Sequence, residues 1–262
     1  MDSFQVGDGA NIAFRHVKGD APVLVFVHGA YLASSEWEPQ LAALGNKAYL
    51  LVDLRGHGYS DKKGYPYSVA KFADDVAQLI MHLGLRDVVL CGHSLGGMVA
   101  QQLAVTHPAL VAKLVLIDTS YGVRSTRLES FLTTLTLLLF NLAPVVWQTE
   151  LFADQIGKHS AEAKRYVQTE IGKHAEDAQN YREIWKAVTQ FSGFAQLGAI
   201  GCKALIMVGG LNKQTHAQAR VMKGRIRMSE LVLVENAGHM LNWDNPEQFN
   251  RVLLAFSKGE AV

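Results

Sequence analysis

The sequence predicts an α/β fold with a mostly parallel β-sheet flanked by helices. Apolar runs of strand length alternate with segments of helical periodicity along most of the chain, which is the pattern of an α/β protein. Several of these runs are continuously apolar and rich in valine, as expected of parallel strands that are covered on both faces. With 262 residues, of which 49% are hydrophobic and 19% charged, the chain can bury one large core.

The chain is expected to begin with an antiparallel hairpin and to continue with parallel strands. Residues 3–6 and 11–16 flank the turn Gly7-Asp8-Gly9-Ala10. Its Asp-Gly pair favours a tight turn, because both positions tolerate positive φ. The later apolar runs predict strands at residues 23–27, 49–53, 88–91, 114–117, 204–208 and 231–234.

Two helices carry end signals as well as apolar periodicity. Ser68 is a suitable start and Gly84 a suitable stop for a helix whose apolar side chains share one face. Near the end of the chain, Asn245 is placed to cap a helix that has Pro246 in its first turn and Gln248 three residues after the cap. These signals predict where both helices begin.

The alternation of strands and helices lapses between residues 121 and 201, which predicts several helices without an intervening strand. We expect residues 1–120 and 202–262 to form the core and residues 121–201 to form a helical cap inserted in it. The segment from Phe131 to Trp147 is more apolar than one buried helix face requires. It fits ordinary packing and a lid over a lipophilic pocket equally well. Candidate substrate-binding residues are Tyr31, Trp37, Phe131 and Leu135, although aromatic side chains are core residues by default.

Composition excludes several classes of partner. The formal net charge of +1 and the lack of like-charged blocks argue against binding to nucleic acid. The uncharged stretch at residues 130–149 contains Thr133, Asn141 and Pro144, so we do not expect it to span a membrane.

The cysteines and the N-terminus bear on the compartment. Cys91 lies within a predicted strand and far in sequence from Cys202, so both are expected to be reduced and buried. We do not expect a secretory signal, because the first residues have neither a basic segment nor an apolar run, and a cytoplasmic setting is favoured. No His or Cys cluster has metal-ligand spacing, and neither a metal nor another cofactor is expected. A homodimer is compatible with the sequence.

The segment Gly92-His93-Ser94-Leu95-Gly96 has a pattern that indicates a catalytic residue. It lies between an apolar strand and a helix, and its glycines flank Ser94 where a tight reversal leaves no room for side chains. This is the Gly-x-Ser-x-Gly nucleophile elbow, which predicts Ser94 as a nucleophile. The alternative is a glycine turn whose serine only caps the helix.

Four segments together resemble the α/β-hydrolase family. They are His28-Gly29-Ala30, the run from Asp53 to Ser60, Gly92 to Gly97, and Gly238-His239, in the order in which the family has them. The resemblance covers nearly the whole chain outside the expected cap. It implies the α/β-hydrolase fold but says little about the substrate.

The resemblance also implies roles for individual residues. It places the catalytic base at His239, which follows a predicted strand and a glycine. It implies an oxyanion hole made by the backbone N–H groups of Leu95 and Ala30, with the adjacent Tyr31 as an alternative to Ala30.

The third catalytic member is where the chain departs from the family pattern. Most relatives have an Asp in the slot that Asn212 occupies here, and asparagine cannot supply negative charge to the imidazolium. Asp118, at the end of the strand after the elbow, is the other place where related enzymes have their acid. We predict Asp118 as the acid, with Asn212 left open and with Glu235 and Asp244 as weaker candidates.

The sequence-based hypothesis is a cofactor-free serine hydrolase that cleaves a carboxylic ester, thioester or lactone with an apolar acyl group through an acyl-enzyme. Its expected partner is a small-molecule acyl substrate. The alternatives are a cofactor-independent ring-cleaving dioxygenase or a carbon-carbon bond hydrolase on the same fold. A ligand-binding receptor is a further alternative, suggested by the missing acid at position 212.

Overall fold

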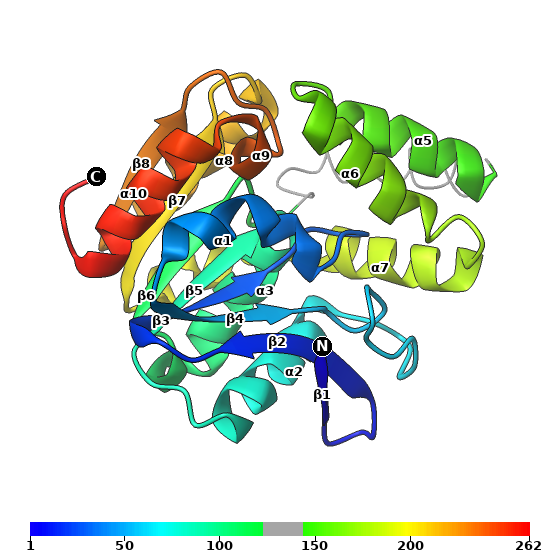
Figure 1. The fold of residues 1–262 in the computed structure, drawn as a ribbon, viewed down its shortest axis with the longest axis horizontal. Coiled ribbons are helices and arrows are strands. Elements are labelled where there is room, and N and C mark those ends of the chain that lie inside the picture. The colour runs from blue at the N-terminus through cyan, green and yellow to red at the C-terminus, as the bar shows by residue number, and fades with distance from the viewer. Residues whose placement is uncertain (123–143) are drawn as a thin grey trace.

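The computed structural model describes residues 1–122 and 144–262, and its centre is one twisted β-sheet (Figure 1). The order of its eight strands is β1-β2-β4-β3-β5-β6-β7-β8. Strands β3 to β8 run parallel to one another, and β2 pairs antiparallel with both β1 and β4. The strands are β1 Asp2–Gln5, β2 Asn11–Val17, β3 Asp20–Val27, β4 Lys47–Val52, β5 Val88–His93, β6 Lys113–Ile117, β7 Lys203–Gly209 and β8 Ser229–Val234. The mostly parallel sheet and its N-terminal hairpin are therefore confirmed.

Helices cover both faces of this sheet, because alternate strand residues are apolar on both sides. One apolar core joins Val25, Leu90 and Leu116 to helices α2, α3 and α8. The other joins Leu24 and Val89 to helices α1 and α10. The core helices are α1 Glu38–Leu44, α2 Val69–His82, α3 Leu95–Thr106, α8 Lys213–Arg225, α9 Leu241–Asp244 and α10 Pro246–Lys258, with 3₁₀ turns at Ser34–Trp37, Pro108–Leu110 and Phe194–Ala199.

The predicted end signals act as expected at two of these helices. The Ser68 side chain accepts a hydrogen bond from the Lys71 N–H at the start of α2. The Asn245 side chain likewise accepts from the Gln248 N–H at the start of α10, which has Pro246 in its first turn. Each bond satisfies a backbone donor that a helix leaves without an internal partner.

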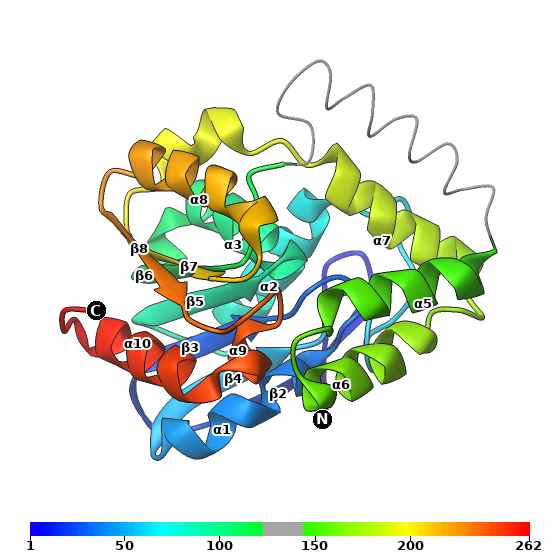
Figure 2. The ribbon, with the colours of Figure 1, turned by 90° about the horizontal axis from the view of Figure 1, so that it is seen from above.

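Helices α5 (Val145–Ile156), α6 (Ala161–Gly172) and α7 (Ala178–Gln190) lie together to one side of the sheet (Figures 1 and 2). In the chain they fall between β6 and β7, and α5 packs against α6. Within the two described ranges, no helix is long and apolar enough to cross a membrane.

The parallel strands bring their carboxyl ends to one edge of the sheet. Ser94 follows β5, Asp118 follows β6, Asn212 follows β7 and His239 follows β8. Because these strands are neighbours in the sheet, residues that are far apart in sequence meet at this edge, which is where open parallel sheets place their ligand sites.

Candidate active site

Ser94 occupies the tight turn between β5 and α3. Its φ of 50° lies in the left-handed region, which non-glycine residues rarely adopt and which costs energy unless the surroundings hold it. Two hydrogen bonds fix the turn: the Ser94 N–H donates to the backbone oxygen of Ile117 at 2.9 Å, and the Thr119 hydroxyl donates to the backbone oxygen of Ser94 at 2.6 Å. The turn is the strained strand-to-helix reversal of a nucleophile elbow.

The glycines around Ser94 are required by close approach of the backbone. A Cβ at Gly92 would lie 2.2 Å from the Gly96 oxygen, and a Cβ at Gly96 would lie 2.1 Å from the Val27 oxygen. Backbone atoms cannot move aside as a flexible side chain can. The steric reason inferred from the sequence for these two glycines is confirmed.

Backbone N–H groups are available for an oxyanion next to Ser94. Leu95 begins α3, and Ala30 lies in the loop after β3; among the described residues, neither N–H has a hydrogen-bond partner. Ala30, Ser94 and His239 line the same small cavity. The preceding loop residue is fixed, because the Gly29 N–H donates to Oε2 of Glu36 at 2.8 Å.

Asp118 and His239, the predicted acid and base, are joined through Asn212. The Asn212 side-chain nitrogen donates to both carboxylate oxygens of Asp118 at 3.1 Å each, and it lies 3.4 Å from Nδ1 of His239. The direct distance from Nδ1 of His239 to Oδ2 of Asp118 is 3.8 Å, which is longer than a hydrogen bond. The structure thus brings Ser94, Asp118, Asn212 and His239 together at one site.

Burial shifts the ionisation of this group. Burial raises the pKa of Asp118 to about 6, although hydrogen bonds from Thr215 and Asn212 act in the opposite direction. Burial and the charge of His93 hold the pKa of His239 well below its usual value. At neutral pH the site therefore has a carboxylate beside a neutral imidazole, which is the state in which an imidazole can accept a proton.

The geometry around Nδ1 of His239 decides which ring nitrogen carries the proton. If Asn212 donates to Nδ1, the proton sits on Nε2, and that nitrogen cannot take the proton of Ser94. If Nδ1 carries the proton, its acceptor is Asp118, and the distance between them must shorten by about 1 Å to reach hydrogen-bond length. The second arrangement is the one that general-base catalysis requires.

A buried pair of side chains, His93 and Glu36, contacts the backbone of His239. Nδ1 of His93 lies 2.6 Å from Oε1 of Glu36, and Nε2 of His93 lies 3.0 Å from the backbone oxygen of His239. Burial disfavours the charged form of His93, but the attraction of Glu36 outweighs it and raises the pKa of His93. Glu36 is not among the residues predicted from the sequence, because nothing in its local sequence marks it as part of a site.

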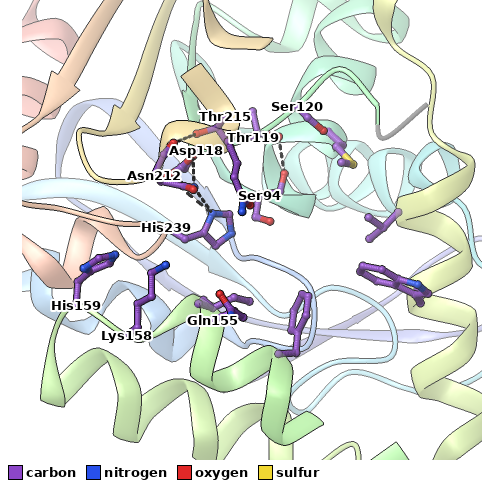
Figure 3. A pocket seen from close by; sticks show the side chains of 16 residues that line it. Ser94, Asp118, Thr119, Ser120, Gln155, Lys158, His159, Asn212, Thr215 and His239 are labelled. Carbon is purple, nitrogen blue, oxygen red and sulfur yellow. Dashed lines mark hydrogen bonds and ion pairs between the residues drawn. The ribbon is translucent and has the colours of Figure 1, made fainter. Parts of the chain in front are cut away.

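A cavity of about 340 Å³ opens beside Ser94 (Figure 3). Helices α5 and α7 contribute the apolar side chains of Phe152, Ile156, Trp185 and Val188 to its wall, while Gln155, Lys158 and His159 are polar. The remaining lining residues are Ser94, Met98, Asp118, Thr119, Ser120, Asn212, Gln214, Thr215 and His239.

Two of the four residues proposed from sequence as substrate-binding residues, Tyr31 and Trp37, do not line this cavity. Tyr31 is fully buried and stacks on Tyr181 at a ring separation of 4.4 Å, and Trp37 is fully buried against Phe26. Both belong to the apolar cores, because a large aromatic ring gains most from complete burial, and neither lines this cavity. Phe131 and Leu135 lie outside the described residues. Within the described ranges, no group of three or more His, Cys, Asp or Glu side chains could hold a metal ion.

The fold and the site define a protein of the α/β-hydrolase class, and comparison with known proteins agrees. The model of the alpha/beta hydrolase family matches residues 24–252. The chain belongs to this family.

Individual relatives differ in activity. The chain is 31% identical over 243 residues to a putative carbamate hydrolase, RutD, of Serratia proteamaculans, which covers 90% of this chain and 91% of that protein. It is 40% identical over 120 residues to a non-heme haloperoxidase of Rhodococcus erythropolis, covering 45% of this chain and only 43% of the haloperoxidase. An esterase from Exiguobacterium antarcticum shares the fold, with a TM-score of 0.84 at 24% identity and 98% of each chain covered.

Proposed function

We propose that the protein is a serine hydrolase that cleaves a carboxylic ester, thioester or lactone through an acyl-enzyme. The observation that carries the proposal is the position of Ser94, which is held at positive φ in the elbow. It lines the same small cavity as His239 and Ala30, and the N–H groups of Ala30 and Leu95 are available nearby. A nucleophile, a neutral base and oxyanion donors are the parts that acyl transfer needs.

In the proposed reaction, the hydroxyl oxygen (Oγ) of Ser94 attacks the substrate carbonyl, and the hydroxyl proton passes to Nε2 of His239. The N–H groups of Leu95 and Ala30 stabilise the oxyanion of the tetrahedral intermediate. The intermediate collapses when the bond to the leaving group breaks and Nε2 gives its proton to that group. Water then attacks the acyl-enzyme by the same route and releases the acid. Asp118 orients His239 and stabilises the imidazolium.

The cavity wall supports an apolar acyl group. Phe152, Ile156, Trp185 and Val188 together present an apolar surface to the space beside Ser94. Burying apolar substrate surface there contributes about 25 cal/mol per Å². A longer acyl chain should therefore raise kcat/KM until the cavity is full.

The test measures hydrolysis of p-nitrophenyl esters of increasing acyl length by the natural protein and by Ser94→Ala. Ser3→Ala, in the edge strand β1, is the matched control. We expect Ser94→Ala to lower kcat by at least about 10³-fold, while Ser3→Ala retains full activity. Ester turnover that survives in Ser94→Ala would contradict the proposal.

The position of the acid favours one second candidate. Cofactor-independent ring-cleaving dioxygenases resemble hydrolases of this fold and also have their acid after the strand that follows the elbow, where Asp118 lies. In the dioxygenase, His239 would deprotonate a bound heteroaromatic hydroxyl. Oxygen uptake with such a substrate, undiminished in Ser94→Ala, would favour this candidate; tight binding without turnover would instead favour a receptor.

A further inference from the structure

We propose that Lys158 and His159 form a binding site for an anionic group, such as a carboxylate, on the leaving-group side of the substrate. This inference rests on the proposed hydrolase function. It names a substrate class that the elbow and the base do not specify.

The two residues lie in the turn between α5 and α6 and line the same cavity as Ser94 and His239. Figure 3 shows Lys158 and His159 on the side of His239 that faces away from Thr119 and Ser120. The placement of His159 is tight: a Cβ added to Gly238 would lie 2.1 Å from its Cδ2 atom. The ring of His159 thus packs directly against the residue that precedes His239.

Lys158 supplies the positive charge of the proposed site, whereas His159 lies near the carboxylate of Asp244 and interacts with it electrostatically. Lys158 has no ion-pair or hydrogen-bond partner among the described residues, whereas nearby Lys164 is paired with Asp154 at 2.9 Å. Asp118 is the one acidic residue among the described side chains that line the cavity. Its side chain is fully buried and accepts both hydrogen bonds of Asn212, so it does not neutralise Lys158.

The chemistry of the proposed reaction determines how the substrate is oriented in the cavity. Nε2 of His239 returns its proton to the leaving group, so the leaving group must lie beside His239. His159 packs against Gly238, next to His239 in the chain, and Lys158 lines the same cavity, whereas Trp185 and Val188 come from α7. The geometry therefore assigns the anionic group to the leaving alcohol and the apolar part to the acyl chain.

The test compares two esters with the same butyryl group and nearly the same phenol, 3-(butyryloxy)benzoate and neutral 3-(butyryloxy)benzamide. We expect the natural protein to prefer the benzoate ester, and the double variant Lys158→Gln/His159→Gln to lose about five- to tenfold in kcat/KM for it, mainly through KM. Turnover of the benzamide ester should stay within about twofold. Lys186→Gln, an exposed lysine of α7 paired with Glu183, is the matched control.

A binding measurement makes the inference independent of turnover. Calorimetry with the Ser94→Ala protein should show tighter binding of 3-hydroxybenzoate than of 3-hydroxybenzamide, and the preference should vanish when Lys158 and His159 are both replaced. If neither ester is hydrolysed in a Ser94-dependent way, the proposed function fails but this preference remains testable. If esters are hydrolysed and the carboxylate gives no preference in rate or binding, this inference alone is overturned.

Discussion

Asn212 donates its side-chain amide to both carboxylate oxygens of Asp118, at 3.1 Å each. The same nitrogen lies 3.4 Å from Nδ1 of His239. The amide therefore stands between the proposed acid and the proposed base. It stabilises the charged form of Asp118, and it competes with Asp118 for the ring nitrogen of His239.

Replacing Asn212 by Asp should change ester turnover only modestly, within about tenfold of the natural rate. Two carboxyl groups in contact cannot both ionise, so the pair would share one proton and keep one negative charge beside His239. Steady-state kinetics at pH 7 to 8 measure this.

Asp118→Asn is the matched comparison for this variant. It should lower kcat by roughly 10³- to 10⁴-fold, because the imidazolium loses its acid partner. A large gain in Asn212→Asp, together with a small loss in Asp118→Asn, would mean that Asp118 is not the acid.

Ester hydrolysis should decline as the pH falls through about 6, the pKa to which burial raises Asp118. The reaction needs the Asp118 carboxylate, and protonation removes it. A pH profile of kcat/KM measures this decline. The residual activity of Asp118→Asn should not decline near pH 6. If it does, the decline belongs to the titration of another group.

Asp118 should also make the free energy of unfolding depend on pH. Its pKa of about 6 in the folded protein, against an ordinary value of 3.8, means that folding favours the protonated form. The favourable contribution is complete below pH 4 and is lost as the pH rises through 6. The loss is about 3 kcal/mol. Denaturant unfolding of the natural protein and Asp118→Asn at several pH values measures it, and a constant difference between the two proteins would contradict it.

Gly96→Ala should destabilise the fold by at least about 2 kcal/mol and abolish ester turnover. The new Cβ would lie 2.1 Å from the Val27 oxygen, so the elbow must move away from β3. Gly172→Ala, at the end of α6 where an added Cβ meets no atom within 4 Å, is the control and should leave stability and activity unchanged. Equal melting temperatures for the two variants would refute the steric argument.

Glu36→Gln should lower the free energy of unfolding by about 3 kcal/mol, because it leaves His93 buried without its charged partner. Glu36 raises the pKa of His93, so the contribution of the pair is fully present below the unfolded pKa of histidine and is lost as the pH rises through the raised pKa of folded His93. The difference between the natural protein and the variant should therefore be larger at pH 6 than at pH 9. Turnover should fall as well, since Glu36 also holds the Gly29 N–H.

Several features of the protein follow from local sequence. The apolar strands, the Asp-Gly hairpin and the helix start at Asn245 depend on the chemistry of neighbouring residues, and the structure has each of them. The need for glycine at positions 92 and 96 was also predictable from the sequence, because a tight strand-to-helix turn around a serine leaves no space for side chains beside it. The roles of Ser94, Asp118 and His239 in catalysis stay predictions.

The sequence by itself determined the α/β architecture and the candidate nucleophile, since each depends on residues that are close together in the chain, and the resemblance to the family added the candidate base His239. The tertiary structure decided what depends on distant residues. It placed Tyr31 and Trp37 in the cores and not in the cavity, and it brought Glu36 onto His93 from 57 positions away. It also set Asn212 between Asp118 and His239, because β6, β7 and β8 are neighbours in the sheet although 94 and 27 positions separate these residues. These distances cannot be read from the spacing of residues in the sequence, because they result from how the strands and helices pack.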